Sequence, residues 1–132
     1  MGAGSVCLVE RVKTLPKVMI VDDDRTTVTL LKTLLELDGF EITVVGRGAD
    51  VIPTVEQVKP DLLFMDYHLS DMDGVDILRE LRAGGPFMNI PIVMTSGLDV
   101  EEEVMAAGAT AFLVKPFEPS DLPDLFNRLI AG

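Results

Sequence analysis

Short apolar runs alternate with helix-like stretches from position 17 to near the end of the chain. The apolar runs are KVMIV (17–21), EITVV (41–45), DLLFM (61–65), IPIVM (90–94) and AFLV (111–114). Stretches with the periodicity of an amphipathic helix cover residues 26–39, 49–58, 74–85, 99–109 and 120–130. Strands that alternate with helices in this way form right-handed β–α–β units and run parallel. The pattern therefore predicts an α/β fold, a five-stranded parallel sheet of the (βα)5 type with helices on both faces.

The polarity of each run indicates its place in the sheet. Residues 18–21 and 62–65 contain no polar side chain, as expected of central strands that are covered on both faces. The run at 41–45 begins with Glu41 and is less apolar, which suits a strand nearer an edge.

Local signals predict how single helices begin and which faces they form. Pro53 fits the second helix only if that helix starts near Ala49, because proline lacks the backbone N–H and is tolerated only in a first turn. Ser120 is the candidate N-cap of the last helix. The first helix carries one apolar face, formed by Val28, Leu31, Leu34 and Leu35.

Length and composition describe one ordinary globular domain. The chain has 132 residues, of which 48% are hydrophobic and 25% charged, enough for one domain with a core. We interpret residues 1–16 as a flexible leader and residues 17–132 as the domain. Cys7 is the single cysteine, so no internal disulfide can form, which fits a reducing, cytoplasmic compartment.

The charge balance argues against two classes of partner. Lys and Arg total 11 against 22 Asp and Glu, which gives a net charge of −11. Direct binding to nucleic acid or to an anionic membrane surface favours a basic face instead. No apolar run approaches the ~20 residues of a membrane-spanning helix. The balance suits a protein that gathers cations or docks on basic partners.

Several apolar runs end on chemically active side chains. Asp22-Asp23-Asp24 follow the first run, Asp66 the third, Ser96 the fourth and Lys115 the fifth. In open parallel sheets, functional groups collect at the carboxyl ends of the strands. Carboxylates brought together there repel each other unless a cation compensates, and Mg²⁺ accepts such oxygen ligands. A metal, a free carboxylate, a hydroxyl and an ammonium around one point predict a site for a phosphoryl group.

Five motifs carry a family resemblance: VMIVDDD, LLFMD, the later MDG, IVMTSG and LVKPF. Together they resemble the receiver domain of two-component response regulators, over residues 17–130. The resemblance implies a flavodoxin-like strand order of 2-1-3-4-5. It also implies that Asp66 is the phosphoacceptor and that Asp22 and Asp23 hold Mg²⁺, with Mn²⁺ as the other candidate ion. Asp66 itself and the main-chain carbonyl of His68 would complete the protein ligands.

Further roles follow from the same resemblance. Ser96 stands where the family has the hydroxyl that bonds the phosphoryl oxygen, and Lys115 supplies the ammonium. Pro116 follows with an expected cis peptide bond, and Phe112 occupies the position of the aromatic switch. The chain departs from the family in two places: Ser70 replaces a proline in the loop after Asp66, and Phe112 lacks the hydroxyl of tyrosine.

The expected function is that of a phosphoacceptor and not of a metabolic enzyme. A sensor histidine kinase or a phosphotransfer protein would donate the phosphoryl group to Asp66, and the domain would catalyse its own phosphorylation and dephosphorylation. Output would pass through the face of the fourth helix, fifth strand and fifth helix, by partner binding or homodimerisation.

Two alternatives remain from the residues. VMIVDDDRT also fits haloacid-dehalogenase-like phosphatases, with Asp22 as nucleophile and Asp24 as general acid. That interpretation lacks a later acidic motif and leaves Asp66 unexplained. The other alternative is a receiver-like interaction module that is never phosphorylated, against which the complete acidic set argues.

Overall fold

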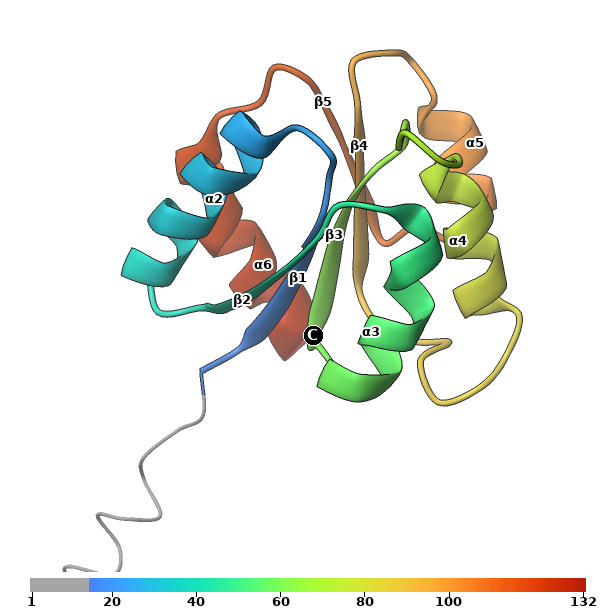
Figure 1. Cartoon of the computed structure of the whole chain (residues 1–132), viewed down its shortest axis with the longest axis horizontal. Coiled ribbons are helices and arrows are strands. Elements are labelled where there is room, and N and C mark those ends of the chain that lie inside the picture. Colours follow the sequence, from blue (N-terminus) through green and yellow to red (C-terminus); the bar gives the residue numbers. More distant parts are fainter. Residues whose placement is uncertain (1–14) are drawn as a thin grey trace, which may run out of the picture.

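The computed structural model describes residues 15–132, which form a sheet between two layers of helices (Figure 1). The strands are Lys17–Val21 (β1), Glu41–Val45 (β2), Leu62–Asp66 (β3), Ile92–Ser96 (β4) and Ala111–Val114 (β5). The helices are Arg25–Leu37 (α2), Val51–Val58 (α3), Gly74–Arg82 (α4), Glu101–Ala106 (α5) and Leu122–Ala131 (α6), with single 3-10 turns at Gly48–Asp50 (η1) and Pro119–Asp121 (η2). Most of the proposed leader, including Cys7, lies outside the described residues, so the domain boundary at position 17 stays a prediction.

The sheet has the order β2-β1-β3-β4-β5 and all its pairs are parallel. This confirms the flavodoxin-like order and the edge position of the run that begins with Glu41. Two strands lie further along the chain than expected. Asp66 pairs with Thr95, and Ser96 pairs with Val114, so Asp66 and Ser96 are the last residues of their strands instead of the residues after them.

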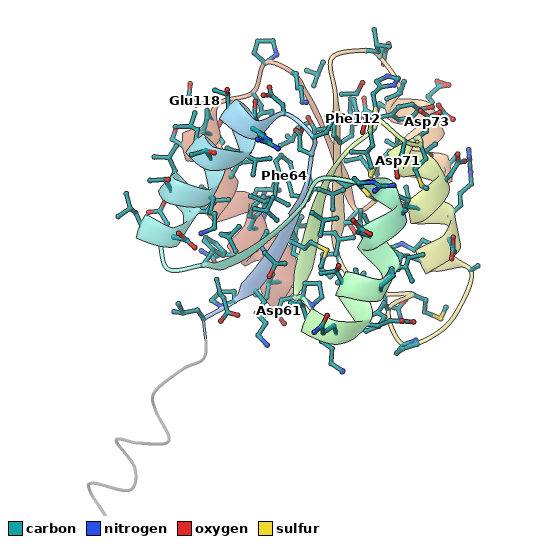
Figure 2. All side chains as sticks on the ribbon, in the orientation of Figure 1. Asp61, Phe64, Asp71, Asp73, Phe112 and Glu118 are labelled. Atoms are coloured by element: carbon teal, nitrogen blue, oxygen red, sulfur yellow. The ribbon has the colours of Figure 1, made fainter. Side chains whose placement is uncertain are left out.

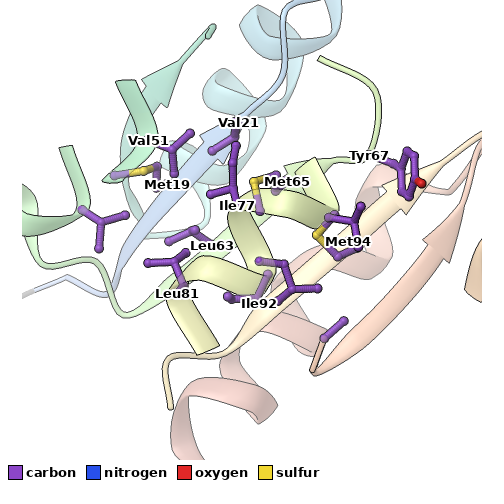
Figure 3. Packing of buried hydrophobic residues seen from close by; sticks show 14 of the residues in the cluster. Met19, Val21, Val51, Leu63, Met65, Tyr67, Ile77, Leu81, Ile92 and Met94 are labelled. Carbon is purple, nitrogen blue, oxygen red and sulfur yellow. The ribbon is translucent and has the colours of Figure 1, made fainter. Parts of the chain in front are cut away.

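Alternating side chains give the sheet two apolar faces. On one face Met19, Leu63 and Met94 pack under α3, α4 and α5 (Figure 3). On the other face Ile20 and Phe64 pack under α2 and α6. Figure 1 shows these helix layers on opposite sides of the strands. Since β1, β3 and β4 are covered on both sides, they have no use for polar alternation, which explains their continuous apolar runs.

Two local predictions about helices were wrong. Leu34 is 37% exposed, whereas Val28, Leu31 and Leu35 are buried, so Leu34 does not belong to the buried face of α2. A helix that covers one side of a sheet buries only the stripe of side chains that faces the sheet, and apolar residues beside that stripe remain exposed. Ser120 does not cap α6; it lies within η2, and α6 begins at Leu122. Pro53 does lie in the first turn of α3, as predicted, after η1.

Among residues 15–132, no helix combines the length and the apolar character that crossing a membrane would require.

Candidate functional site at the carboxyl ends of the strands

Two neighbouring strands bring the acidic residues together. β1 and β3 pair in parallel with Val21 opposite Met65, so the next residues of each chain segment, Asp22 and Asp66, come side by side. One carboxylate oxygen from each of Asp22, Asp23 and Asp66 lies within 4.8 Å of the other two. Asp22 and Asp66 are buried and Asp23 is exposed. The three predicted carboxylates therefore meet at one point with one side open to solvent.

The third aspartate of the first run has a different task. Asp24 is the N-cap of α2: its carboxylate accepts hydrogen bonds from the backbone N–H of Thr26 at 3.1 Å and from the hydroxyl of Thr27 at 2.8 Å. The bond from Thr27 contributes most to holding the pKa of Asp24 below its ordinary value. The backbone N–H of Asp24 in turn donates to Asp22 at 2.9 Å, which orients the Asp22 carboxylate. A helix cap bonded in this way is poorly suited to act as a general acid.

Lys115 supplies the positive charge of the site. Its Nζ lies 3.3 Å from Oδ1 of Asp66 and 3.5 Å from Oδ2 of Asp22. The backbone N–H of Lys115 donates to the carbonyl of Ser96 at 2.8 Å, which anchors the end of β5 to β4. The peptide bond from Lys115 to Pro116 is cis, as the resemblance implied.

Burial raises the pKa of the Asp66 carboxyl, since removing the carboxylate from water disfavours its charge. The ammonium of Lys115 acts in the opposite direction, and the neighbouring charge of Asp22 adds to the increase. One lysine thus faces three converging carboxylates. A hard cation with oxygen ligands fits this donor set, and Asp22, Asp23 and Asp66 are the side chains that could hold it.

Ser96 and Phe112 stand at the same end of the sheet but outside this cluster. Ser96 is fully buried, and its Oγ accepts a hydrogen bond from the N–H of Leu98 at 3.0 Å. Within the described residues no hydrogen bond joins Ser96 to Asp66. Phe112 is half-buried opposite Met94 and packs at the margin of the core under α5 (Figure 2).

The loop between β3 and α4 explains the MDG motif. The N–H of Gly74 donates to the carbonyl of Tyr67 at 2.6 Å, and a Cβ at position 74 would overlap the carbonyl oxygen of Asp66. Only glycine allows this close approach of backbone to backbone. His68 begins the same loop; its side chain is exposed, with Nδ1 3.9 Å from Asp73. Among residues 15–132 no contact joins the His68 carbonyl to these carboxylates, so its role as a metal ligand stays a prediction.

Sequence reasoning missed three residues that support this loop. Asp71 accepts hydrogen bonds from the N–H groups of Gly48 and Ala49. Tyr67 donates its hydroxyl to Glu103 of α5 at 2.7 Å. These partners are separated by 22 to 36 positions. No periodicity or motif signals such a pairing, so only the folded arrangement could reveal it.

The chain is similar to known proteins of one family. The family described as "Response regulator receiver domain" matches residues 18–127. The DNA-binding response regulator MtrA of Mycolicibacterium paratuberculosis is 35% identical over 109 residues, which cover 80% of this chain and 47% of that protein. The chain thus spans about half the length of the curated relatives it matches.

Solved structures show the same fold. The receiver domain of the Francisella response regulator 1452 superposes with a TM-score of 0.82 at 28% identity, over 88% of this chain and 97% of the other. The receiver domain of sensor histidine kinase PA1611 from Pseudomonas aeruginosa gives 0.80 at 27% identity, over 89% and 98%, and holds a magnesium ion in its active-site cleft.

Proposed function

The chain belongs to the response regulator receiver family of two-component systems, and from this premise we propose that Asp66 is the residue that receives the phosphoryl group. One observation carries the proposal: the Asp66 carboxylate ends a buried strand, shares Lys115 with Asp22, and lies within 4.8 Å of two further carboxylates. Of the three aspartates it is the one on the middle strand of the sheet. The donor would be a phosphohistidine of a sensor kinase or of a phosphotransfer protein.

Each group of the site has a role in the transfer. An oxygen of Asp66 bonds to phosphorus while the P–N bond of the donor breaks and its electron pair returns to the imidazole nitrogen. Lys115 Nζ, already 3.3 Å from Asp66, is placed to neutralise the charge on the phosphoryl oxygens. Mg²⁺, or Mn²⁺ in its place, would supply further neutralisation of this charge when bound. Asp22, Asp23, Asp66 and the His68 carbonyl would hold it.

The transfer also requires the ionised form of Asp66. Since burial raises the pKa of this carboxyl, protonation competes with attack at a higher pH than for an exposed aspartate. Lys115 opposes that increase, so it keeps the nucleophile charged as well as stabilising the product. Self-catalysed hydrolysis of the resulting acyl phosphate would restore the carboxylate.

Ser96 and Phe112 form the proposed switch. The hydroxyl of Ser96 would turn toward the phosphoryl oxygen, and Phe112 would move inward into the space that this opens. Phe112 has no hydroxyl, so burial alone would drive it, at roughly 1–3 kcal/mol for a large apolar side chain. Nuclear magnetic resonance with and without beryllofluoride checks the coupling. Unchanged resonances at both residues would contradict it.

Output is proposed to pass through the face of α5, β5 and α6. This face carries exposed apolar side chains at Met105 and Val114, beside the half-buried Phe112. It would bind a downstream partner or a second copy of the chain. A cytoplasmic location and a domain that begins at residue 17 complete the proposal.

Acetyl phosphate labelling followed by peptide mapping tests the acceptor. We expect labelling on Asp66 that depends on Mg²⁺ and disappears in Asp66→Asn. Asp61→Asn is the matched control, because Asp61 lies near the opposite end of β3 and should leave labelling unchanged (Figure 2). Label on Asp22 would instead support the phosphatase alternative, and no label at all would support an unphosphorylated interaction module.

A further inference from the structure

The loop that joins β3 to α4 has no proline to hold its shape. Ser70 stands at the position where the resemblance expects proline, and residues 70 to 73 are exposed. Closure within the loop comes from backbone bonds: Leu69 N–H to the Met72 carbonyl at 3.1 Å, and Gly74 N–H to the Tyr67 carbonyl. The loop also contains His68, whose carbonyl is a proposed metal ligand. Its position therefore matters to the site, and internal bonds alone do not set it relative to the sheet.

Asp71 connects this loop to another part of the fold. Its two carboxylate oxygens accept one hydrogen bond each, at 2.8 Å from the N–H of Gly48 and at 3.0 Å from the N–H of Ala49. Both donors lie in η1, which leads directly into α3. These N–H groups have no partner inside the turn, and the helix dipole favours a negative charge there. The two donors hold the pKa of Asp71 below its ordinary range, so this side chain is a carboxylate at neutral pH.

Met72, the residue after Asp71, also connects the loop to η1, through packing of its side chain. A Cβ at position 48 would overlap the side chain of Met72, so Met72 packs directly against the backbone of Gly48 in η1. The surface on which it rests is rigid, because α3 is anchored by Val51 and Val55, both fully buried. Two adjacent loop residues, Asp71 and Met72, thus dock on one firmly held turn.

We propose that Asp71 is a positioning residue, which holds the β3–α4 loop against η1 so that the His68 carbonyl is presented to the metal bound by Asp22, Asp23 and Asp66. The inference rests on the proposed function. Asp71 contributes here what a proline would contribute elsewhere, since it restricts the loop through two long-range hydrogen bonds. Its own carboxylate is occupied by backbone N–H groups and does not bind the metal.

The competing explanation is a helix cap and nothing more. In that case the loss of Asp71 would weaken the start of α3 but leave the metal site untouched. The two explanations differ in the affinity for Mg²⁺ and in the protection of amides inside the loop, which a cap does not affect.

The test compares three variants with the wild-type chain. Asp71→Ala removes both acceptors and Asp71→Asn keeps one. Asp50→Asn is the matched control: Asp50 is exposed at the start of the same helix, and its side chain makes no capping bond. Calorimetric titration with Mg²⁺ gives the dissociation constant, and amide hydrogen exchange followed by nuclear magnetic resonance reports on Gly48, Ala49 and Leu69.

We expect Asp71→Ala to weaken Mg²⁺ binding about tenfold, the lower end of the range for residues that orient a metal ligand. Asp71→Asn should have a smaller effect, and Asp50→Asn should bind as the wild type does. The Leu69 amide should lose protection together with those of Gly48 and Ala49. Labelling by acetyl phosphate should return to the wild-type rate at saturating Mg²⁺, because Asp71 does not touch the reacting atoms.

Two results would overturn the proposal. Unchanged Mg²⁺ affinity in Asp71→Ala, with lost protection only at Gly48 and Ala49, reduces Asp71 to a cap and leaves the proposed function standing. Absence of Mg²⁺ binding by the wild-type chain removes the metal site itself, and the proposed function fails together with the inference.

Discussion

At the scale of single residues, the consecutive aspartates Asp22, Asp23 and Asp24 have different roles because the backbone turns between β1 and α2 and directs their side chains differently. Asp22 directly follows β1 and its carboxylate lies beside that of Asp66, whereas the carboxylate of Asp24 caps α2. Asp23 joins the cluster from the exposed side. Only Lys115 lies within ion-pair distance of this cluster in the part of the chain that is described. Three negative groups therefore face one positive group, and we expect a bound cation to relieve the repulsion among them.

The repulsion predicts that Asp23→Asn stabilises the metal-free protein. Two carboxylates about 4 Å apart repel by up to ~4 kcal/mol at an effective dielectric constant of about 20, and solvent at Asp23 reduces this, so we expect a gain of about 1 kcal/mol. Mg²⁺ should stabilise the wild type, by ~2.7 kcal/mol at about 100 times its dissociation constant. Most of that gain should be absent in the variant. Thermal melts with chelator and with Mg²⁺ measure both effects.

Asp38→Asn is the control for the removal of one negative charge, since Asp38 lies at the other end of α2. It should change neither the metal-free melting temperature nor the response to Mg²⁺ appreciably. If Asp23→Asn destabilised the metal-free protein and kept the full Mg²⁺ response, the three carboxylates would not meet as described.

At the scale of elements, α5 is the helix with the least regular support. It has six residues, no side chain caps its start, and Val104 is its one buried residue. Glu103 gives α5 two polar contacts with the rest of the fold. Its Oε1 accepts a hydrogen bond from the Tyr67 hydroxyl, and its Oε2 lies 3.5 Å from Nη2 of Arg79 in α4. The residue next to the proposed acceptor is thus bonded to a helix of the proposed output face.

The contact with Glu103 leads to a prediction about the ionisation of the Tyr67 hydroxyl at alkaline pH. The hydrogen bond to Glu103, more than any other contact, raises the pKa of Tyr67 to about 12. A tyrosine whose pKa is raised in the folded state contributes stability that is fully present below about pH 10, its unfolded pKa, and is lost as the pH rises toward 12. In Glu103→Gln the pKa should fall toward 10, and amide exchange in α5 should accelerate.

Absorbance of the tyrosinate near 295 nm measures this titration, and circular dichroism confirms that the fold persists along it. The signal is specific because the chain contains one tyrosine and no tryptophan. Glu102→Gln, one position earlier on the same helix, is the control and should titrate like the wild type. Identical titrations for Glu103→Gln and the wild type would mean that this hydroxyl bond does not hold α5.

At the scale of the whole molecule, two apolar cores keep the sheet and its reactive end in place. The core under α2 and α6 is closed by Phe126, whose ring centroid lies 6.0 Å from that of Phe40 and 5.4 Å from that of Phe64. These contacts join the last helix to the loop before β2 and to the strand that carries Asp66. Stability of the site therefore depends on a residue far from it in the sequence.

Phe126→Ala should lower the free energy of unfolding by about 3–5 kcal/mol, because it leaves a cavity in a closed core. Leu37→Ala is the matched control on the same side of the sheet: Leu37 is 79% exposed, and its loss should cost within about 0.5 kcal/mol. Urea denaturation followed by circular dichroism gives both values. Equal midpoints for the two variants would show that α6 is not part of the cooperative core.

Local properties of the chain sufficed for much of this description. Apolar runs without polar alternation identified the central strands, since a strand covered on both sides needs no polar side chain. The motifs at the strand ends predicted that Asp22, Asp23, Asp66 and Lys115 would meet, because parallel strands bring their carboxyl ends to one edge, and these side chains do lie together. The exact ends of strands and starts of helices were not predicted: β3 ends at Asp66 and α6 begins at Leu122, each one or two residues later than expected. Backbone hydrogen bonds to neighbouring segments determine these limits, and the sequence pattern does not show them.

The tertiary structure alone decided which residues support the site. Asp71 reaches Gly48, and Tyr67 reaches Glu103, across loops whose path depends on the packing of whole helices. It also decided that Leu34 faces solvent although its sequence pattern matches its buried neighbours. Periodicity and motifs describe interactions between near positions or between equivalent strand ends. A contact between two irregular segments has no such regularity, so it becomes visible only when both segments have their place in the fold.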